Sequence, residues 1–367
     1  MALSIFSQRE LVEIRRDARL ENPTDWFRRT YFGGTPFFSD NMEIAFGKIT
    51  GTRAMAPFAQ PSHMGKPIVK HRGMSVETFT PAYIKLLDAV RPEDATSLTP
   101  EEVLTGERLD MQARFDLRTS EVAEQHLTSI YRTWDYMCAR ALIDAAVTVK
   151  YEHDQGQPNP EVTISFGRDP NLTVAYSAGI DWSSPTHDIL GDLSEWVGLG
   201  RAAQFGGNYN NLILGANVVA PFMANNQIKE LLDTKYRGGE GTSFQRGLVV
   251  TGMSDDNNRP AYLGRIGGTG GALDVWTYRD QQLTDAGNTV EMLNPNDIFM
   301  SAPGVNGLMA FGAIYDVQAS AAGIRTDIFQ KQYEIPNPSA INMLSQSAPL
   351  PIPRFPNRTF KATVLNI

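Results

Sequence analysis

The chain has 367 residues, of which 42% are hydrophobic and 20% charged, and its net charge is −8. This composition is typical of an ordered globular protein, and the length allows two or three subdomains. The acidic balance argues against a protein whose main task is to grip nucleic acid, because that task needs a concentrated positive surface.

The chain has one cysteine, Cys138, which excludes an intrachain disulfide framework and suits a reducing compartment. The N-terminal segment lacks the basic stretch and apolar run of a signal peptide. The most apolar segment, 212–224, is interrupted by Asn217 and Pro221 and is shorter than the roughly 20 residues that span a bilayer. We therefore expect a protein made in the cytoplasm, without a membrane partner.

Two segments near the N-terminus have contrasting patterns. Ser7 to Glu10 form a capping box, and the apolar spacing that follows predicts a short amphipathic helix over 8–20. Residues 41–81 are strand-like at both ends and punctuated by glycine and proline between them. They predict a long two-stranded ribbon, which is only marginally stable alone, so we expect it to lie on a neighbour.

A long helix is predicted in the middle of the chain. A capping box with proline at the first helical position, Thr99 to Glu102, precedes it. Apolar residues then recur at steps of three and four over 121–147, which predicts a helix of roughly 40 Å with one buried face. These residues are Ala123, Leu127, Ile130, Trp134, Met137, Ala141 and Ala145. Such a face needs a sheet or long hairpin along it, and the hairpin that follows directly is a candidate.

Strands and helices alternate in the second half of the chain. The predicted elements are a hairpin within 147–167, a candidate third strand at 171–177, a helix at 188–203, a strand at 211–215, a helix at 221–237 ended by Gly238 and Gly239, and a strand at 247–252. From residue 188 onward this pattern predicts a separate α/β subdomain that extends to about residue 315.

The sequence contains no recognisable enzyme motif. The histidines, which lack the spacing of a zinc site, are His63, His71, His126, His153 and His187. No serine lies in a G-x-S-x-G motif, and Cys138 lies within the long helix rather than at an exposed helix start, so we expect a buried structural thiol. We interpret the histidines as structural or surface residues and expect no catalytic residues, cofactor or metal.

Two other segments superficially suggest ligand sites. The glycine cluster at 264–271 fits neither phosphate-binding pattern and precedes a strand-like segment, so we interpret it as a hairpin turn. The acidic segment at 254–258 lacks the ligand spacing of an EF-hand and is interpreted as an exposed turn.

The C-terminal segment has alternate prolines followed by a strand-like tail. Proline fixes φ and lacks the backbone donor, so this segment cannot be helix or central strand and must be a stiff extended connector. The prolines are Pro349, Pro351, Pro353 and Pro356. The tail, 359–367, is rich in β-branched and apolar residues and should pair with another strand.

Several segments resemble the lambda-like major capsid proteins of the phage capsid protein E family. "ETFTPAYIK" (77–85) resembles that family's Phe-Thr-Pro-x-Tyr-hydrophobic-Lys segment, and "MLSQSAPLP" (343–351) is similar to its Gln-Ser-Ala-Pro-Leu segment near the C-terminus. Collinear similarities between them are "GIDWSSP" at 179–185, "KELLDTKYRG" at 229–238, "LNPNDIFM" at 293–300 and "FGAIYDVQASAAGI" at 311–324. Residues 51–72 and 201–210 have no counterpart that we can place.

The resemblance implies an α+β protein with the Hong Kong-97-type major capsid fold. Its expected parts are an N-terminal arm (1–48), an extended loop with its return strand (49–85), a peripheral domain with a long spine helix (86–185), an axial domain (186–315), and a return to the peripheral domain with the C-terminal strand (316–367). In this fold the last strand is expected to close the peripheral sheet.

The implied function is that of a head protein that self-assembles into hexamers and pentamers of an icosahedral shell around double-stranded DNA. The implied partners are other copies of the chain, a separate scaffolding protein, a portal, a possible decoration protein and weakly bound DNA. Candidate DNA contacts are Arg15, Arg16 and Arg19, and candidate crosslinking lysines, for a reaction that we do not expect, are Lys48, Lys66 and Lys70. Alternatives are an encapsulin-type compartment of the same fold and an α/β enzyme with an unrecognised site.

Overall fold

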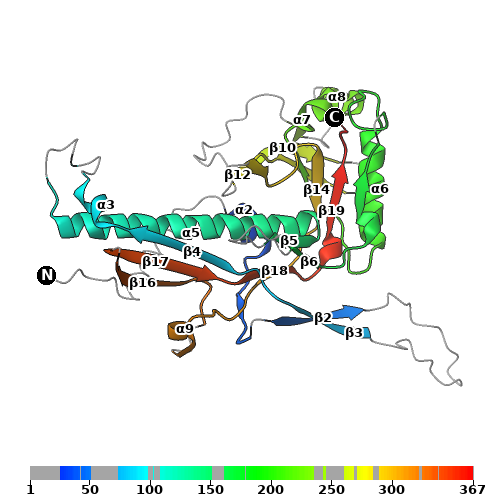
Figure 1. The fold of residues 1–367 in the computed structure, drawn as a ribbon. Helices are drawn as coiled ribbons and strands as arrows, with labels where there is room; N and C mark the ends of the chain where they lie inside the picture. Colours follow the sequence, from blue (N-terminus) through cyan, green and yellow to red (C-terminus); the bar gives the residue numbers. More distant parts are fainter. Residues whose placement is uncertain are drawn as a thin grey trace, which may run out of the picture.

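The computed structural model describes residues 25–41, 43–50, 73–97, 102, 108–150, 161–177, 179–234, 243–244, 260–267, 271–283, 289–321, 325–337 and 339–366. A long helix lies over a three-stranded sheet, and a seven-stranded sheet stands at the C-terminal end of this helix (Figure 1). The predicted helix at 8–20 and strand at 247–252 lie outside the described residues.

The long helix is α5 (Met111–Ile143), whose 33 residues span about 50 Å. The side chain of Asp110 caps it by accepting a hydrogen bond from the backbone N–H of Met111 at 2.8 Å. All seven predicted apolar positions are buried, but the predicted boundaries at 121 and 147 were wrong. The helix ends earlier because Ala145 has a φ of 52°, a left-handed conformation that turns the chain into a strand.

The sheet beneath α5 has the antiparallel order β16 (Phe329–Pro336), β17 (Ser339–Ser347) and β4 (Ile84–Val90). Alternate residues of the central strand face α5: Ile341 packs against Phe115 and Met343 against Ala123. The sequence therefore predicted correctly that a sheet would cover the helix, but the expected partner was wrong.

That expected partner, the hairpin of β5 (Ala146–Lys150) and β6 (Glu161–Ser165), does form in antiparallel register. A five-residue strand is only about 17 Å long, so the hairpin cannot cover α5 and packs near its C-terminal end. The predicted third strand, β7 (Thr173–Ala175), does not join this hairpin and pairs instead with the C-terminal strand.

The predicted ribbon is present at its base. The strands β2 (Ile44–Thr50) and β3 (Gly73–Phe79) pair antiparallel from Ile44 opposite Phe79 to Thr50 opposite Gly73. They point away from the layer formed by α5 and its sheet (Figure 1). Residues 51–72, and with them the middle of the predicted ribbon, lie outside the described part of the chain.

The larger sheet has seven strands and is mixed. Its order is β7, β19 (Thr359–Thr363), β14 (Asp297–Ser301), β8 (Asn211–Leu214), β11 (Leu273–Thr277), β10 (Ala261–Ile266) and β9 (Ser243–Phe244). The helix α6 (Ile189–Ala202), predicted at 188–203, packs on it through Trp196, whose ring centroid lies 5.1 Å from that of Phe360. The smaller elements are α3 (Pro92–Thr96), η1 (Pro170–Leu172), β12 (Gln281–Leu283), β13 (Thr289–Glu291), α9 (Val317–Ala321) and η3 (Pro356–Arg358).

The last strand was expected to close the peripheral sheet, and that expectation was wrong. β19 lies inside the seven-stranded sheet, antiparallel to β14 and parallel to β7. Its side chains Phe360 and Ala362 are buried in the core that α6 covers, which accounts for its apolar alternation.

The helix predicted at 221–237 is broken in two, α7 (Val219–Ala224) and α8 (Asn226–Thr234). Asn225 between them has extended backbone angles and a buried side chain. Its side-chain nitrogen Nδ2 donates to the carbonyl of His187 at 2.8 Å, and its side-chain oxygen Oδ1 accepts from the backbone N–H of Gln227 at 2.9 Å. The side chain thus satisfies an N-terminal donor of the second helix, and this local bonding competes with a continuous helix.

The alternate prolines lie in β18 (Pro349–Pro353), which pairs with β15 (Gly307–Phe311), and β15 pairs on its other side with β1 (Phe37–Phe38). β18 is an edge strand of this sheet, so the expected extended, non-central conformation is confirmed for Pro349, Pro351 and Pro353, but it was wrong for Pro356, which begins the 3-10 helix η3. Leu350 and Ile352 separate the prolines, so the missing donors recur with the two-residue period of a strand and lie on one side of it.

Gly307 should not tolerate a larger side chain. A Cβ at this position would overlap the buried ring of Phe32. We expect Gly307→Ala to lower the free energy of unfolding by about 1–3 kcal/mol through overpacking. Gly198→Ala in α6 is the matched control, because nothing lies within 4 Å of its added Cβ. Equal unfolding midpoints in urea for the two variants would contradict the expectation.

Candidate assembly interface

The segment that precedes the ribbon is anchored by aromatic side chains of the short helix α2 (Trp26–Tyr31). Trp26 and Phe27 contact Tyr278, with ring centroids 5.5 and 5.4 Å away. Tyr31 contacts Phe299 of β14, and its hydroxyl lies 2.8 Å from the Ser301 hydroxyl. The helix therefore forms part of the core between α5 and the seven-stranded sheet.

A buried carboxyl of α5 also holds this helix. The backbone N–H of Arg28 donates to Asp135 Oδ1 at 2.8 Å, and the Arg28 guanidinium pairs with Asp25 while lying 5.7 Å from the ring centroids of Tyr131 and Trp134. Burial raises the pKa of Asp135 to about 8, although the hydrogen bond from Arg28 opposes this. Asp135 is therefore mostly protonated at neutral pH.

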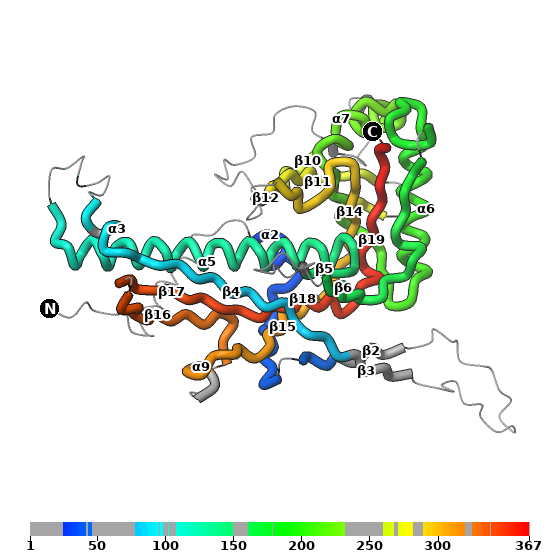
Figure 2. The backbone as a smooth tube through the Cα atoms, viewed as in Figure 1, coloured from blue at the N-terminus to red at the C-terminus, as the bar shows by residue number. Residues whose placement is uncertain are grey.

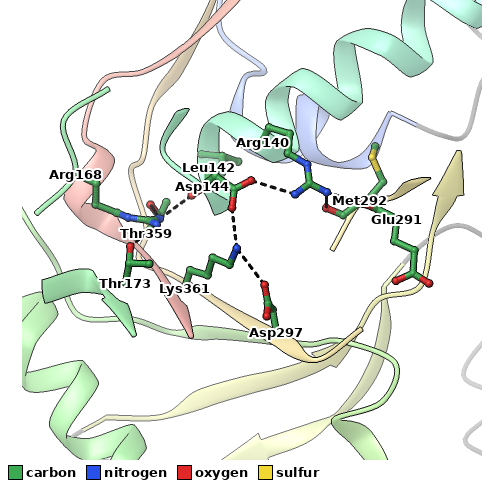
Figure 3. A network of polar contacts seen from close by, with 10 residues as sticks. All are labelled: Arg140, Leu142, Asp144, Arg168, Thr173, Glu291, Met292, Asp297, Thr359 and Lys361. Atoms are coloured by element: carbon green, nitrogen blue, oxygen red, sulfur yellow. Dashed lines mark hydrogen bonds and ion pairs between the residues drawn. The ribbon is translucent and has the colours of Figure 1, made fainter. Parts of the chain in front are cut away.

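The C-terminal end of α5 is tied to the seven-stranded sheet by a lysine between two carboxylates (Figure 3). Lys361 Nζ in β19 lies 2.8 Å from Asp144 Oδ1, at the end of α5, and 3.1 Å from Asp297 Oδ2, at the start of β14. Burial alone would raise the pKa of Asp144, but Lys361 and Arg140 lower it below its usual value. Burial would lower the pKa of Lys361, but its hydrogen bond and charge contacts with both carboxylates raise it, so the group stays ionic.

Two arginines extend this junction. Arg140 donates to Asp144 Oδ2 at 3.1 Å and to the carbonyls of Glu291 and Met292 at 2.6 and 3.2 Å. On the other side, Arg168 bonds both the end of α5 and β19 (Figure 3). Its acceptors are the Leu142 carbonyl at 3.1 Å, Thr359 Oγ1 at 3.3 Å and Thr173 Oγ1 at 2.8 Å. Burial lowers the pKa of Arg168 to about 10, which still leaves it charged at neutral pH. This junction, which we call the spine–sheet junction, fixes how the helix meets the sheet.

Two of the histidines lie in the described residues, and both have structural roles. His126 of α5 bonds Ser345 through Nδ1 at 2.9 Å and Asp88 through Nε2 at 2.8 Å. This has the residue types of a serine-hydrolase triad, but Ser345 is fully buried and also accepts from Gln330, so no substrate reaches it. His187 lies 2.7 Å from Asp192.

The remaining candidates for chemistry are structural or lie outside the described residues. Cys138 is buried in α5, and burial raises the pKa of its thiol well above the usual value. The glycine cluster begins within β10 and precedes β11, and these two strands pair antiparallel as the predicted hairpin. In the described ranges no group of three or more His, Cys, Asp or Glu side chains could hold a metal ion, and no helix there is long and apolar enough to cross a membrane. The acidic turn at 254–258 lies outside these ranges, as do Arg15, Arg16, Arg19, Lys66 and Lys70; Lys48 lies in β2.

The model of the family described as "Phage major capsid protein E" matches residues 18–364. The chain belongs to the phage major capsid protein E family. It is therefore a major capsid protein of a lambda-like tailed phage and a structural component of the virion, not an enzyme. The family that the sequence resembled is therefore confirmed.

Individual capsid proteins show the extent of this similarity. The major capsid protein of Escherichia phage lambda is 24% identical over 338 residues, which cover 89% of this chain and 88% of that protein. The major capsid protein of Escherichia phage N15 is 23% identical over 95% of this chain and 96% of its own. The crystal structure of a prophage capsid protein from Escherichia coli CFT073 covers 99% of this capsid protein at 15% identity, with a TM-score of 0.67. The α+β architecture is thus similar to that of this prophage capsid protein.

Proposed function

We propose that this capsid protein assembles into hexamers and pentamers of an icosahedral shell that encloses double-stranded DNA. In this proposal α5 is the spine helix of a peripheral domain (86–185), and most of the seven-stranded sheet belongs to an axial domain (186–315). The arm (1–48) and the extended loop (49–85) precede them, and residues 316–367 return through β17 and β18 to β19.

The ribbon of β2 and β3 carries this proposal. A two-stranded ribbon is marginally stable unless it packs on another surface. The three-stranded sheet offers such a surface on the side away from α5, because Leu87 and Tyr333 point there with exposed fractions of 52% and 36%. A ribbon from one subunit that covers this face on its neighbour would bury area on both. Many such contacts around a closed shell add up to a stable particle.

Removal of the ribbon's outer part tests the proposal. We expect replacement of residues 51–72 by an Asn-Gly turn to leave a folded subunit, since Thr50 and Gly73 are already paired and that turn suits a two-residue hairpin. The variant should have the circular dichroism spectrum of the natural chain but form no shells in negative-stain microscopy and analytical ultracentrifugation. Normal shells from this variant would refute a role of the ribbon in assembly.

The partners proposed for assembly are a separate scaffolding protein, a portal and a possible decoration protein. The chain's net charge of −8 suits a container that must release its DNA, so contact with the genome should be weak and nonspecific. Arg15, Arg16 and Arg19 remain the proposed contacts. If particles in which these three arginines are replaced by alanine retained the genome regardless of salt concentration, this role would be contradicted.

A further inference from the structure

Two exposed surfaces at opposite ends of the subunit have complementary character. The first, the arginine–aromatic corner, comprises Phe205, Phe355, Arg354 and Arg358 and lies where the chain leaves α6 and passes from β18 to β19. The second, the acidic end, comprises α3 and the first half of α5. Figure 2 shows α3 and the start of α5 at one end of the molecule and α6 with β19 at the other.

The corner presents an exposed ring, Phe205, beside the half-buried ring of Phe355, together with positive charge. Phe205 is 43% exposed, which leaves a large apolar ring in water, and its φ of 54° is a left-handed conformation that is unfavourable for a bulky residue. Its ring centroid lies 6.1 Å from that of Phe355, and the Arg358 guanidinium lies 4.9 Å from the Phe355 ring centroid. Arg358 Nη1 donates to the carbonyls of Pro303 and Gly304 at 2.8 and 2.9 Å, which hold the side chain in place without neutralising it. Arg354 is exposed beside them.

The acidic end has the opposite charge and its own exposed apolar side chains. The described residues 88–97, 102 and 108–124 contain eight acidic residues and four arginines, a net charge of −4. Its exposed apolar side chains are Leu109 at 42%, Met111 at 57% and Leu117 at 36%. Leu117, Glu121 and Glu124 follow one another at spacings of four and three, so they share one face of the helix.

We propose that the corner of one subunit binds the acidic end of a second copy of this chain. The two surfaces differ, so the contact is head-to-tail, and head-to-tail contacts close into rings when the rotation between subunits allows it. Opposite charges would set the orientation and speed the encounter, while the exposed Phe205 ring and apolar side chains would be buried. This inference rests on the proposed assembly into rings and adds which ends of neighbouring subunits meet.

Charge reversal at each surface tests the contact. Arg354→Glu places like charges opposite each other in a ring of identical subunits, and so does Glu124→Arg. Arg354 and Glu124 are both exposed, and in the described part of the chain neither has a hydrogen bond, ion pair or ring contact that its replacement would remove. We expect each variant to assemble at least about tenfold more slowly by light scattering. Lys229→Glu, an exposed charge reversal on α8, is the matched control and should assemble at the natural rate.

An equal mixture of the two variants gives the sharper result. In a six-membered ring in which they alternate, the introduced glutamate meets the introduced arginine, and the natural pair is restored at every other contact. We therefore expect the mixture to assemble within about twofold of the natural rate, and raised salt to slow both mixture and natural chain. Slow assembly of the mixture, or natural rates for both single variants, would overturn the inference.

A substitution of the Phe205 side chain tests the apolar part of the proposed contact. Asparagine tolerates positive φ, so Phe205→Asn removes the ring while keeping the backbone conformation. We expect an unchanged or higher unfolding midpoint together with slower assembly, and unchanged assembly would contradict the contact. Natural chain that forms neither rings nor shells would instead refute the proposed function itself, so the two failures are distinguishable.

Discussion

Replacing Lys361 by methionine is expected to lower the free energy of unfolding by about 2–3 kcal/mol. The reason is that Asp297, 2% exposed, and the partly buried Asp144 would both lose the cation between them. Removal of one partner from a buried ionic group costs more than the group contributes, because the remaining charge stays desolvated. Urea denaturation of unassembled subunits measures the change.

Two controls separate this cause from a general effect of losing a lysine. Adding Asp297→Asn to Lys361→Met should recover part of the loss, since it removes the stranded charge. Arg265→Met removes the Arg265 to Asp274 ion pair, whose arginine is 54% exposed, and should cost less than about 1 kcal/mol. Equal losses for Lys361→Met and Arg265→Met would show that the spine–sheet junction is no more than a surface ion pair.

The junction also has a consequence for assembly. Lys361 and Arg168 join the end of α5 to β19 of the seven-stranded sheet, and Arg140 joins it to the segment from β13 to β14, so together they fix the angle between the two layers. Shell curvature depends on the shape that each subunit repeats. We therefore expect particles from Lys361→Met to vary more in diameter than those of the natural chain under negative-stain microscopy.

The sequence predicted local elements well because their signals are local. The apolar spacing of α5 and the alternate prolines of β18 each reflect the conformation of their own segment. The boundary at Ala145 was missed because alanine favours helix, and only the position of the following strand requires its positive φ. The break at Asn225 depends on the His187 carbonyl, 38 residues away in sequence.

Strand partners and the junction could not be predicted, because they depend on contacts between distant segments. β7 and β19 are separated by most of the second half of the chain, and nothing in either marks the other as its partner. Lys361 and Asp144 are likewise 217 residues apart. The family resemblance supplied the overall architecture, but it led to the wrong sheet for the last strand, since apolar alternation fits either sheet.

Replacing Asp135 by asparagine is expected to remove a loss of stability that the natural chain shows as pH rises. Burial raises the pKa of Asp135 to about 8, whereas a carboxyl in the unfolded chain titrates near 4. Between these values the folded state holds a proton that the unfolded state has released. The free energy of unfolding therefore falls by about 1.4 kcal/mol per pH unit in this range. The stabilisation that comes from the proton held by Asp135 is fully present below about pH 4 and is lost as pH rises through about 8.

Asparagine suits this test because it resembles the protonated carboxyl and can still accept the bond from the Arg28 N–H. Denaturation of unassembled subunits between pH 5 and 7 should show a slope that differs between natural chain and variant by about 1.4 kcal/mol per unit. Burial also raises the pKa of the neighbouring Asp280, but that group is present in both proteins and affects both slopes. Glu124→Gln, exposed on the same helix, is the control for loss of a carboxyl. Parallel slopes for natural chain and Asp135→Asn would mean that Asp135 is ionised in the folded state, so that α2 is held by a buried charge rather than by a neutral acceptor.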